Sequence, residues 1–154
     1  MPTKKAKAPP RDICLGLLPN LLGYRLRLAQ RAVFADFRVR VGDPQIGPGL
    51  FGILEIVENN PGLKQSELAR GLGLDRSSLV PALNRLERRN LLSRESSPQD
   101  RRSNGLHLSS QGRQLLRALR RRVSRHESTL AARLTPQEHH TLMHLLGKLT
   151  EETS

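Results

Sequence analysis

Residues 63–108 decide the fold of this chain, and they run LKQSELARGLGL (63–74), DRSSLVPALNRLERRNLL (75–92) and SRESSPQDRRSNGLHL (93–108). Apolar residues recur at helical spacing in the first two segments, which a glycine-containing turn separates. The inner sides of these two helices are expected to hold Leu68, Ala69 and Leu72, then Leu79, Val80, Leu83 and Leu86. A strand, a charged loop and a return strand follow. This order predicts a winged helix-turn-helix, in which the second helix enters the major groove of DNA.

The charge of the chain is concentrated in the same region. Its 26 Lys and Arg against 14 Asp and Glu give a formal net charge of +12, and fifteen of the basic but five of the acidic residues lie within 61–125. Arginine supplies 21 of the 26 cations, and its planar guanidinium suits phosphate oxygens and guanine edges. A compositional habit of the organism explains part of the Arg/Lys ratio but little of the clustering. A polyanionic partner is therefore expected.

Composition also indicates the compartment and the division of the chain. A single cysteine excludes a disulfide within one chain and fits a reducing environment. No run of 18 apolar residues and no signal peptide is present, so a cytoplasmic protein without membrane contact is expected. We expect residues 1–11 to be a disordered basic arm, 43–108 to be the DNA-binding domain, and 12–42 with 109–154 to form a helical dimerisation region. The predicted fold class is mainly α with a small β wing.

Long helices are expected at both ends of the chain. One is predicted over Ile13 to Val41, with Pro19 in its first turns or marking its start, and another over Ser109 to Arg133. The sequence Thr135-Pro136-Gln137-Glu138 has the form of a capping box that opens a last helix, expected to bury Leu142, Leu145, Leu146 and Leu149. This much apolar surface predicts a two-fold homodimer, and hence a pseudo-palindromic operator with half-sites roughly 10 bp apart or a multiple of that.

The candidate DNA-contacting residues lie on the second helix and in the wing. Asp75 is expected at the N-cap of that helix, with its carboxylate on the first amides. Asp100 is expected to shape the wing by pairing with Arg101 or Arg94, and Pro81 offers an apolar contact to a thymine methyl. Each exposed cation could also be an ordinary solvated residue. The predicted contacts are Arg76, Ser77, Ser78, Pro81, Asn84, Arg85 and Arg88 on the helix, and Arg94, Arg101 and Arg102 in the wing.

From about Ile13 to Glu152 the chain resembles the MarR (multiple antibiotic resistance regulator) family of transcription factors. The resemblance lies in the segment SELARGLGLDRSSLVPALNRLE and in the wing, where Asp100-Arg101-Arg102 precedes Leu106, Leu108 and Ser109. It implies a homodimer that represses or activates a promoter and is released by a small ligand. Pro81 departs from the Ser or Thr that the family often has there.

The resemblance also implies an effector pocket between the dimerisation helices and the winged domain, with walls from residues 21–37, 51–57 and 113–125. Aromatic side chains beside arginines there suit an aromatic carboxylate or an acyl-coenzyme A thioester. The candidate residues are Tyr24, Arg25, Arg31, Phe34, Phe37, Phe51, Arg117 and Arg120. An ordinary hydrophobic core with arginines on its outside explains the same pattern.

Some features of the sequence are compatible with other functions. The resemblance also allows a redox-sensing regulator, with Cys14 as the sensing thiol and Tyr24 as the tyrosine available to it. His140 and His144 could share a metal, although no further ligands are evident. A non-specific architectural protein would carry the same charge, because phosphate neutralisation is independent of sequence. No hydrolase, nucleotide-binding or metalloprotease motif is present. We therefore expect no enzyme, no cofactor and no metal site.

Overall fold

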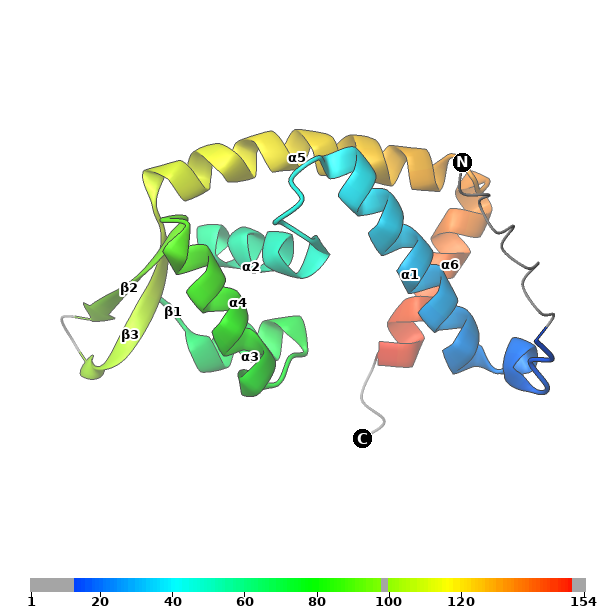
Figure 1. The fold of residues 1–154 in the computed structure, drawn as a ribbon, viewed down its shortest axis with the longest axis horizontal. Coiled ribbons are helices and arrows are strands. Elements are labelled where there is room, and N and C mark those ends of the chain that lie inside the picture. Colours follow the sequence, from blue (N-terminus) through cyan, green and yellow to red (C-terminus); the bar gives the residue numbers. More distant parts are fainter. Residues whose placement is uncertain (1–12, 98–99, 151–154) are drawn as a thin grey trace, which may run out of the picture. The chain divides into compact units, whose positions relative to one another are not determined.

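The computed structural model describes residues 13–97 and 100–150, and of residues 96–97 and 100–103 it describes the backbone alone. The chain divides into two compact units, Met1–Ala32 and Val33–Ser154, and the helix α1 (Leu22–Val41) belongs partly to each. Figure 1 shows the elements in chain order. After α1 these are α2 (Pro48–Asn59), β1 (Leu63–Lys64), α3 (Gln65–Leu72), α4 (Arg76–Arg88), β2 (Leu92–Ser97), β3 (Asp100–Leu108), α5 (Ser110–Ala131) and α6 (Pro136–Thr150).

In the first unit, α1 begins later than the sequence predicted. A 3-10 turn, η1 (Leu18–Asn20), contains Pro19 and precedes the helix, so regular α-structure starts at Leu22 instead of Ile13. Gly16 adopts a left-handed conformation with φ +54°, which interrupts any helix and which glycine tolerates best. Among residues 13–32, the large aliphatic side chains are exposed: Ile13, Leu15, Leu17, Leu18, Leu21, Leu22, Leu26 and Leu28.

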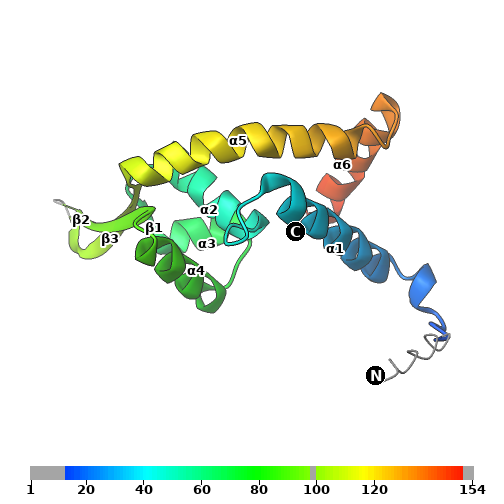
Figure 2. The same ribbon diagram turned by 45° about the horizontal axis from the view of Figure 1, so that its top comes forward.

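The core of the second unit lies among α2, α3, α4, α5 and the sheet, and Figure 2 shows α5 running along one side of the smaller helices. Most of the predicted inner residues of α3 and α4 are buried there, and Leu72 is half-buried against them. Val80 is half-buried but lies outside the core cluster, where Ala82 packs instead. The apolar residues with at most 1% exposure lie between the end of α1 and the middle of α5: Val41, Ile46, Ile53, Leu54, Val57, Leu68, Leu79, Leu83, Leu86, Leu91, Leu106, Leu116 and Leu119.

The sheet has three antiparallel strands in the order β1-β3-β2. Leu92 in β2 lies opposite Leu108 in β3, and the register shifts between Ser96 and Ser97. The strand β1 was not predicted, because two residues between a turn and a helix carry no alternation to detect. It pairs Leu63 with Leu106 and so joins the start of α3 to the wing.

The passage from the wing into α5 is tightly packed. Ser109 caps the helix by accepting a hydrogen bond from the Gly112 amide at 2.9 Å, and its hydroxyl donates to the Asn90 carbonyl at 2.6 Å. A Cβ on Gly112 would lie 2.0 Å from the carbonyl oxygen of Leu91. The first turn of α5 therefore rests directly on the backbone between α4 and β2, which fixes where α5 leaves the sheet.

The last helix confirms the predicted capping box but not the predicted burial. The Thr135 amide donates to the Glu138 carboxylate at 2.8 Å, and the Glu138 amide donates to the Thr135 hydroxyl at 3.3 Å. The Thr135 amide and hydroxyl both donate to the Glu138 carboxylate, and these two hydrogen bonds lower the pKa of Glu138. However, α6 has no buried residue: Leu146 is half-buried, and Leu142, Leu145 and Leu149 are 44%, 51% and 54% exposed, because nothing in the described part of a single chain covers them. Among the described helices, none has the length and apolar character needed to cross a bilayer.

Candidate nucleic-acid interface

The turn between α3 and α4 sets the position of the second helix. Gly73 ends α3 in the left-handed region at φ +60°, and its amide donates to the Arg70 carbonyl at 3.1 Å. The Leu74 amide then donates to the Ala69 carbonyl at 2.9 Å, so the two hydrogen bonds complete the last turn of α3. Glycine is the residue that accepts this backbone conformation without strain.

Asp75 is the N-cap of α4, as predicted, but through its backbone. The amides of Ser78 and Leu79 donate to the Asp75 carbonyl, both at 3.1 Å, while its carboxylate makes no capping hydrogen bond. The first amides of α4 are thus not capped by a side chain. Positive partial charge at this end of the helix is suited to an anion.

The helix α4 separates buried and exposed residues sharply. Leu79, Leu83 and Leu86 have no exposed surface, which fastens this side to the core. The seven helix residues predicted to contact DNA are all exposed: Arg76, Ser77, Ser78, Pro81, Asn84, Arg85 and Arg88. The helix continues through Pro81 to Arg88, although proline removes the amide that would bond to the Ser77 carbonyl. The structure therefore presents the predicted set to solvent along one rod.

An open hollow of about 510 Å³ lies along this exposed side, lined by Pro81, Asn84, Glu87 and Arg88. Three of these residues belong to the predicted set, and Glu87 does not. The hollow places an apolar ring, an amide and a guanidinium next to one another. This combination suits contact with a surface that is both apolar and polar, such as the edges of stacked bases.

Arg94 on β2 is held against α4. One guanidinium nitrogen lies 3.1 Å from the Glu87 carboxylate and another donates to the Asn84 side-chain carbonyl at 3.0 Å, and its side chain is 25% exposed. The structure thus gives Arg94 partners on α4, whereas the sequence suggested DNA or Asp100. The role of Glu87 as an ion-pair partner was not predicted, because Arg94 is seven residues away on β2. The contact holds the side-chain carbonyl of Asn84 on the Arg94 guanidinium.

The wing tip is only partly described. Asp100 stands opposite Ser97 in the β2–β3 ladder, and Arg101 and Arg102 follow in β3. The side chains of these three residues lie outside the described part of the structure, as do residues 98–99 altogether. Their predicted roles therefore remain predictions.

The candidate effector residues of the first unit have local partners. The Arg27 guanidinium lies 5.1 Å from the centre of the Tyr24 ring, and Arg25 donates to the Pro19 carbonyl at 2.7 Å. Arg31 is exposed. Cys14, the candidate redox residue, is exposed as well.

The candidates of the second unit do not form one cluster. Phe37 is 4% exposed and packs in the core, with its ring centre 6.3 Å from that of the half-buried Phe51. Arg120 makes two hydrogen bonds to Glu55, at 2.8 and 2.9 Å, and these raise the pKa of Arg120 against the effect of burial. Phe34 and Arg117 are exposed. Phe37 therefore serves as a core residue and Arg120 as an ion-pair partner of α2.

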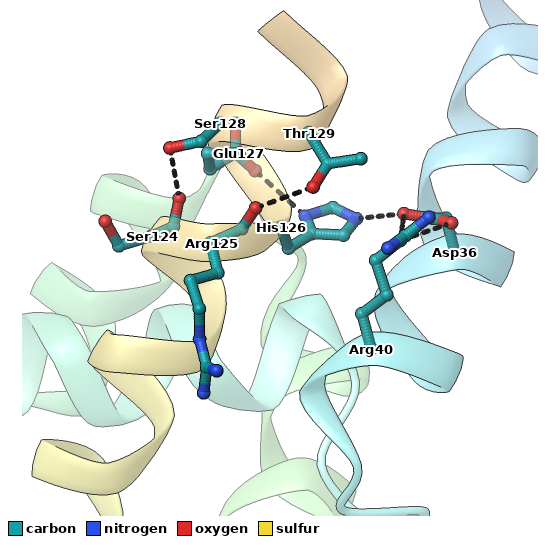
Figure 3. A network of polar contacts seen from close by, with 8 residues as sticks. All are labelled: Asp36, Arg40, Ser124, Arg125, His126, Glu127, Ser128 and Thr129. Carbon is teal, nitrogen blue, oxygen red and sulfur yellow. Dashed lines mark hydrogen bonds and ion pairs between the residues drawn. The ribbon is translucent and has the colours of Figure 1, made fainter. Parts of the chain in front are cut away.

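A buried histidine that the sequence analysis did not single out links α5 to the end of α1. Figure 3 shows His126 between Asp36 and Glu127, with each carboxylate 3.3 Å from one ring nitrogen. Asp36 also receives Arg40 at 2.8 Å. The Phe37 ring meets the imidazole edge-on, with centres 5.5 Å apart. The available signal was its spacing, because His126 continues the apolar stripe of α5 at helical intervals.

The two histidines of α6, His140 and His144, are exposed. Across residues 13–97 and 100–150, no three His, Cys, Asp or Glu side chains gather in a way that could hold a metal ion.

Comparison with known proteins identifies relatives over nearly the whole chain. It is 38% identical, over 98% of its length and 92% of the relative's, to a putative transcriptional regulatory protein for the hcr operon of Thauera aromatica. It is also similar to the transcriptional repressor CouR bound to a 23-mer DNA duplex (37% identity, 92% of this chain and 100% of that one, TM-score 0.82). A second CouR structure, bound to p-coumaroyl-CoA, matches with 36% identity over 92% and 99% and a TM-score of 0.84.

The PcaV regulator of Streptomyces coelicolor in complex with its natural ligand matches with 26% identity, over 93% of this chain and 100% of that one, and a TM-score of 0.82. The model of the MarR family matches residues 47–103, which span α2 to the wing. These matches confirm the predicted winged helix-turn-helix fold. With a relative 38% identical over almost its full length, the chain belongs to the MarR family of transcriptional regulators.

Proposed function

We propose that the protein is a ligand-responsive transcriptional repressor that binds duplex DNA through α4. The observation that carries this proposal is the two-sided character of α4, on which three fully buried leucines oppose seven exposed polar, basic or proline residues. A helix that is packed against the core along one side and exposed along the other can enter the major groove while the core stays intact. The related CouR repressor has been seen on a DNA duplex, which supports the same role for this chain and a place in the cytoplasm.

The repressor acts as a homodimer in this proposal. Exposed leucines line the described part of the first unit, and Leu142, Met143, Leu145 and Leu149 are exposed on α6. Apolar surface of this extent at both ends of a chain is typical of an interface, and two-fold symmetry would present two copies of α4 to a pseudo-palindromic operator.

The effector is proposed to be an aromatic carboxylate or its coenzyme A thioester. CouR is known with p-coumaroyl-CoA and PcaV with its natural ligand, and both are similar to this chain along most of its length. Ligand binding would release the operator by favouring a dimer geometry in which the two α4 helices no longer match the grooves.

The test begins with selection of a binding site from fragments of genomic DNA. Fluorescence anisotropy then compares the selected duplex with a shuffled one at physiological salt. The selected site is expected to bind roughly a thousandfold more tightly or better. Equal affinities would instead establish a non-specific architectural protein. In the same assay, Arg85→Gln is expected to weaken specific binding about tenfold or more, whereas Arg133→Gln, which removes an exposed charge after α5, changes it little.

The dimer is tested by sedimentation of a Leu145→Glu/Leu149→Glu variant. Two charges on the exposed side of α6 are expected to produce a monomer that keeps its helical circular dichroism, because neither residue belongs to the core of the chain. A variant that stays dimeric would contradict the assignment of α6 to the interface.

A further inference from the structure

A polar pocket lies in the second unit, where the end of α1 meets the second half of α5. It has a volume of about 350 Å³ and is lined by Arg40, Arg122, Arg125, His126 and Thr129. This volume is at the lower end of the range for small-molecule sites. The lining differs from that of a usual organic pocket, because three of the five residues are arginines and none is aliphatic or aromatic apart from the imidazole. The pocket is separate from the exposed side of α4.

The three arginines differ in how far other groups already pair with their guanidinium groups. Arg40 is paired with Asp36 at 2.8 Å, so its charge is largely compensated. Arg122 donates one of its guanidinium hydrogens to the Val41 carbonyl at 2.9 Å, and no carboxylate is paired with it in the described part of the chain. The Arg125 guanidinium has no partner within the described part of the chain, and Figure 3 shows it extending away from the polar network around His126. Two cations thus remain to attract an anion.

His126 supplies the buried polar atom of the pocket. Its side chain is fully buried, and its Nε2 has no hydrogen-bond partner of acceptable geometry in the described structure, although Asp36 Oδ2 is 3.3 Å away. A buried polar nitrogen without a well-oriented hydrogen bond is unfavourable. A ligand oxygen that reached this nitrogen would remove that penalty. The carboxylates that oppose an anion here are those of Asp36 and the largely exposed Glu127.

We propose that this pocket binds the phosphate groups of the effector, and that the effector is therefore a coenzyme A thioester in preference to a free acid. The inference rests on the proposed function, since it assigns a chemical class to its ligand. Guanidinium forks match phosphate oxygens, whereas the Thr129 hydroxyl donates its hydrogen to the Arg125 carbonyl at 2.9 Å and is not counted as a ligand. An aromatic ring would find no apolar partner among the five lining side chains, so the acyl group must bind elsewhere.

Isothermal titration calorimetry of the full-length protein tests the proposal with three probes: coenzyme A, inorganic pyrophosphate and benzoate. The variants are Arg125→Gln and, as matched control, Arg121→Gln. Both residues are exposed arginines on α5, but Arg121 does not line the pocket. Arg125→Gln is expected to weaken coenzyme A and pyrophosphate about tenfold or more, since it removes a charge-assisted hydrogen bond. Arg121→Gln should change either by less than about twofold.

Thr129→Val is a second variant, nearly equal in size and lacking the hydroxyl. Because that hydroxyl donates to the Arg125 carbonyl, this variant is a second control and should change the affinities for coenzyme A and benzoate by less than about twofold. Equal losses for Arg125→Gln and Arg121→Gln, or a loss of benzoate affinity without a loss of coenzyme A affinity in Arg125→Gln, would overturn the phosphate assignment.

Operator binding without any effector separates this inference from the proposed function. Arg125→Gln should bind the selected operator as the wild type does but should need more coenzyme A thioester for release. A wild-type protein without sequence-specific DNA binding contradicts the proposed function whatever the calorimetry shows. Normal operator binding with unaltered release in Arg125→Gln contradicts the pocket assignment alone.

Discussion

Gly112→Ala tests the junction between the wing and α5. The added Cβ would lie 2.0 Å from the Leu91 carbonyl oxygen, far inside the 3.4 Å at which ordinary contact begins. The first turn of α5 or the backbone at Leu91 must move, and that carbonyl also accepts the Ser109 amide at 3.1 Å. Overpacking costs about 1–3 kcal/mol and a lost hydrogen bond roughly 1 kcal/mol. Together they predict a loss of about 3 kcal/mol, or roughly 6–12 °C in Tm.

The measurement is urea unfolding followed by circular dichroism, at one fixed protein concentration because association adds to stability. Gly71→Ala is the matched control. Its Cβ would meet only the end of the Ile56 side chain at 3.9 Å, and alanine is favoured over glycine within a helix by roughly 0.5–1 kcal/mol. The pair should therefore move in opposite directions. A Gly112→Ala protein within about 1 kcal/mol of wild type would refute the inference that this contact positions α5.

Three further predictions concern the DNA surface and pH. Arg102→Ala should weaken DNA binding with a reduced salt slope and unchanged sequence preference, whereas Arg85→Ala should also relax the preference, as anisotropy titrations with mutated sites would show. Asn84→Ala should relax sequence preference while leaving the urea midpoint nearly unchanged; a large fall in that midpoint would make Asn84 a structural residue. Burial raises the pKa of Asp43, but hydrogen bonds from the Gln45 amide and Arg89 outweigh it and leave the pKa lowered. The resulting stability is present above the unfolded-state pKa and is lost as pH falls through the folded-state value. Unfolding of Asp43→Asn should therefore depend less steeply on pH below about 5 than that of wild type.

Periodicity was sufficient to predict most of the fold. The buried leucines of α4 recur at helical spacing, and the glycine at the end of α3 and the aspartate before α4 mark the turn between them. These signals are local, and local propensity and tertiary packing agree here. The start of α1 was misplaced because a hydrophobic pattern continues through residues 13–21, whereas Gly16 and Pro19 set the backbone.

The contacts between distant residues were out of reach of the sequence. Arg120 pairs with Glu55, 65 residues away, and one apolar stripe on α5 contains a histidine whose partner lies on α1. With 21 arginines in the chain, charge alone cannot say which cations face a carboxylate and which face solvent. The exposed side of α4 was predictable, because it is the side opposite the apolar residues. The polar pocket was not predictable, because its lining comes from two helices, α1 and α5, that are distant in sequence.

The ion pair between Asp43 and Arg89 has a mechanical consequence. Asp43 lies just beyond the end of α1 and Arg89 just beyond the end of α4, and their side chains meet at 3.0 Å, 46 residues apart in sequence. Another nitrogen of Arg89 is buried with no described partner, and the side chain as a whole is 27% exposed, so separating the two would leave a partly buried cation without its counter-ion. The ion pair therefore couples the end of α1 to the end of α4. If one helix end is displaced, the other helix end moves with it or the Asp43–Arg89 ion pair breaks.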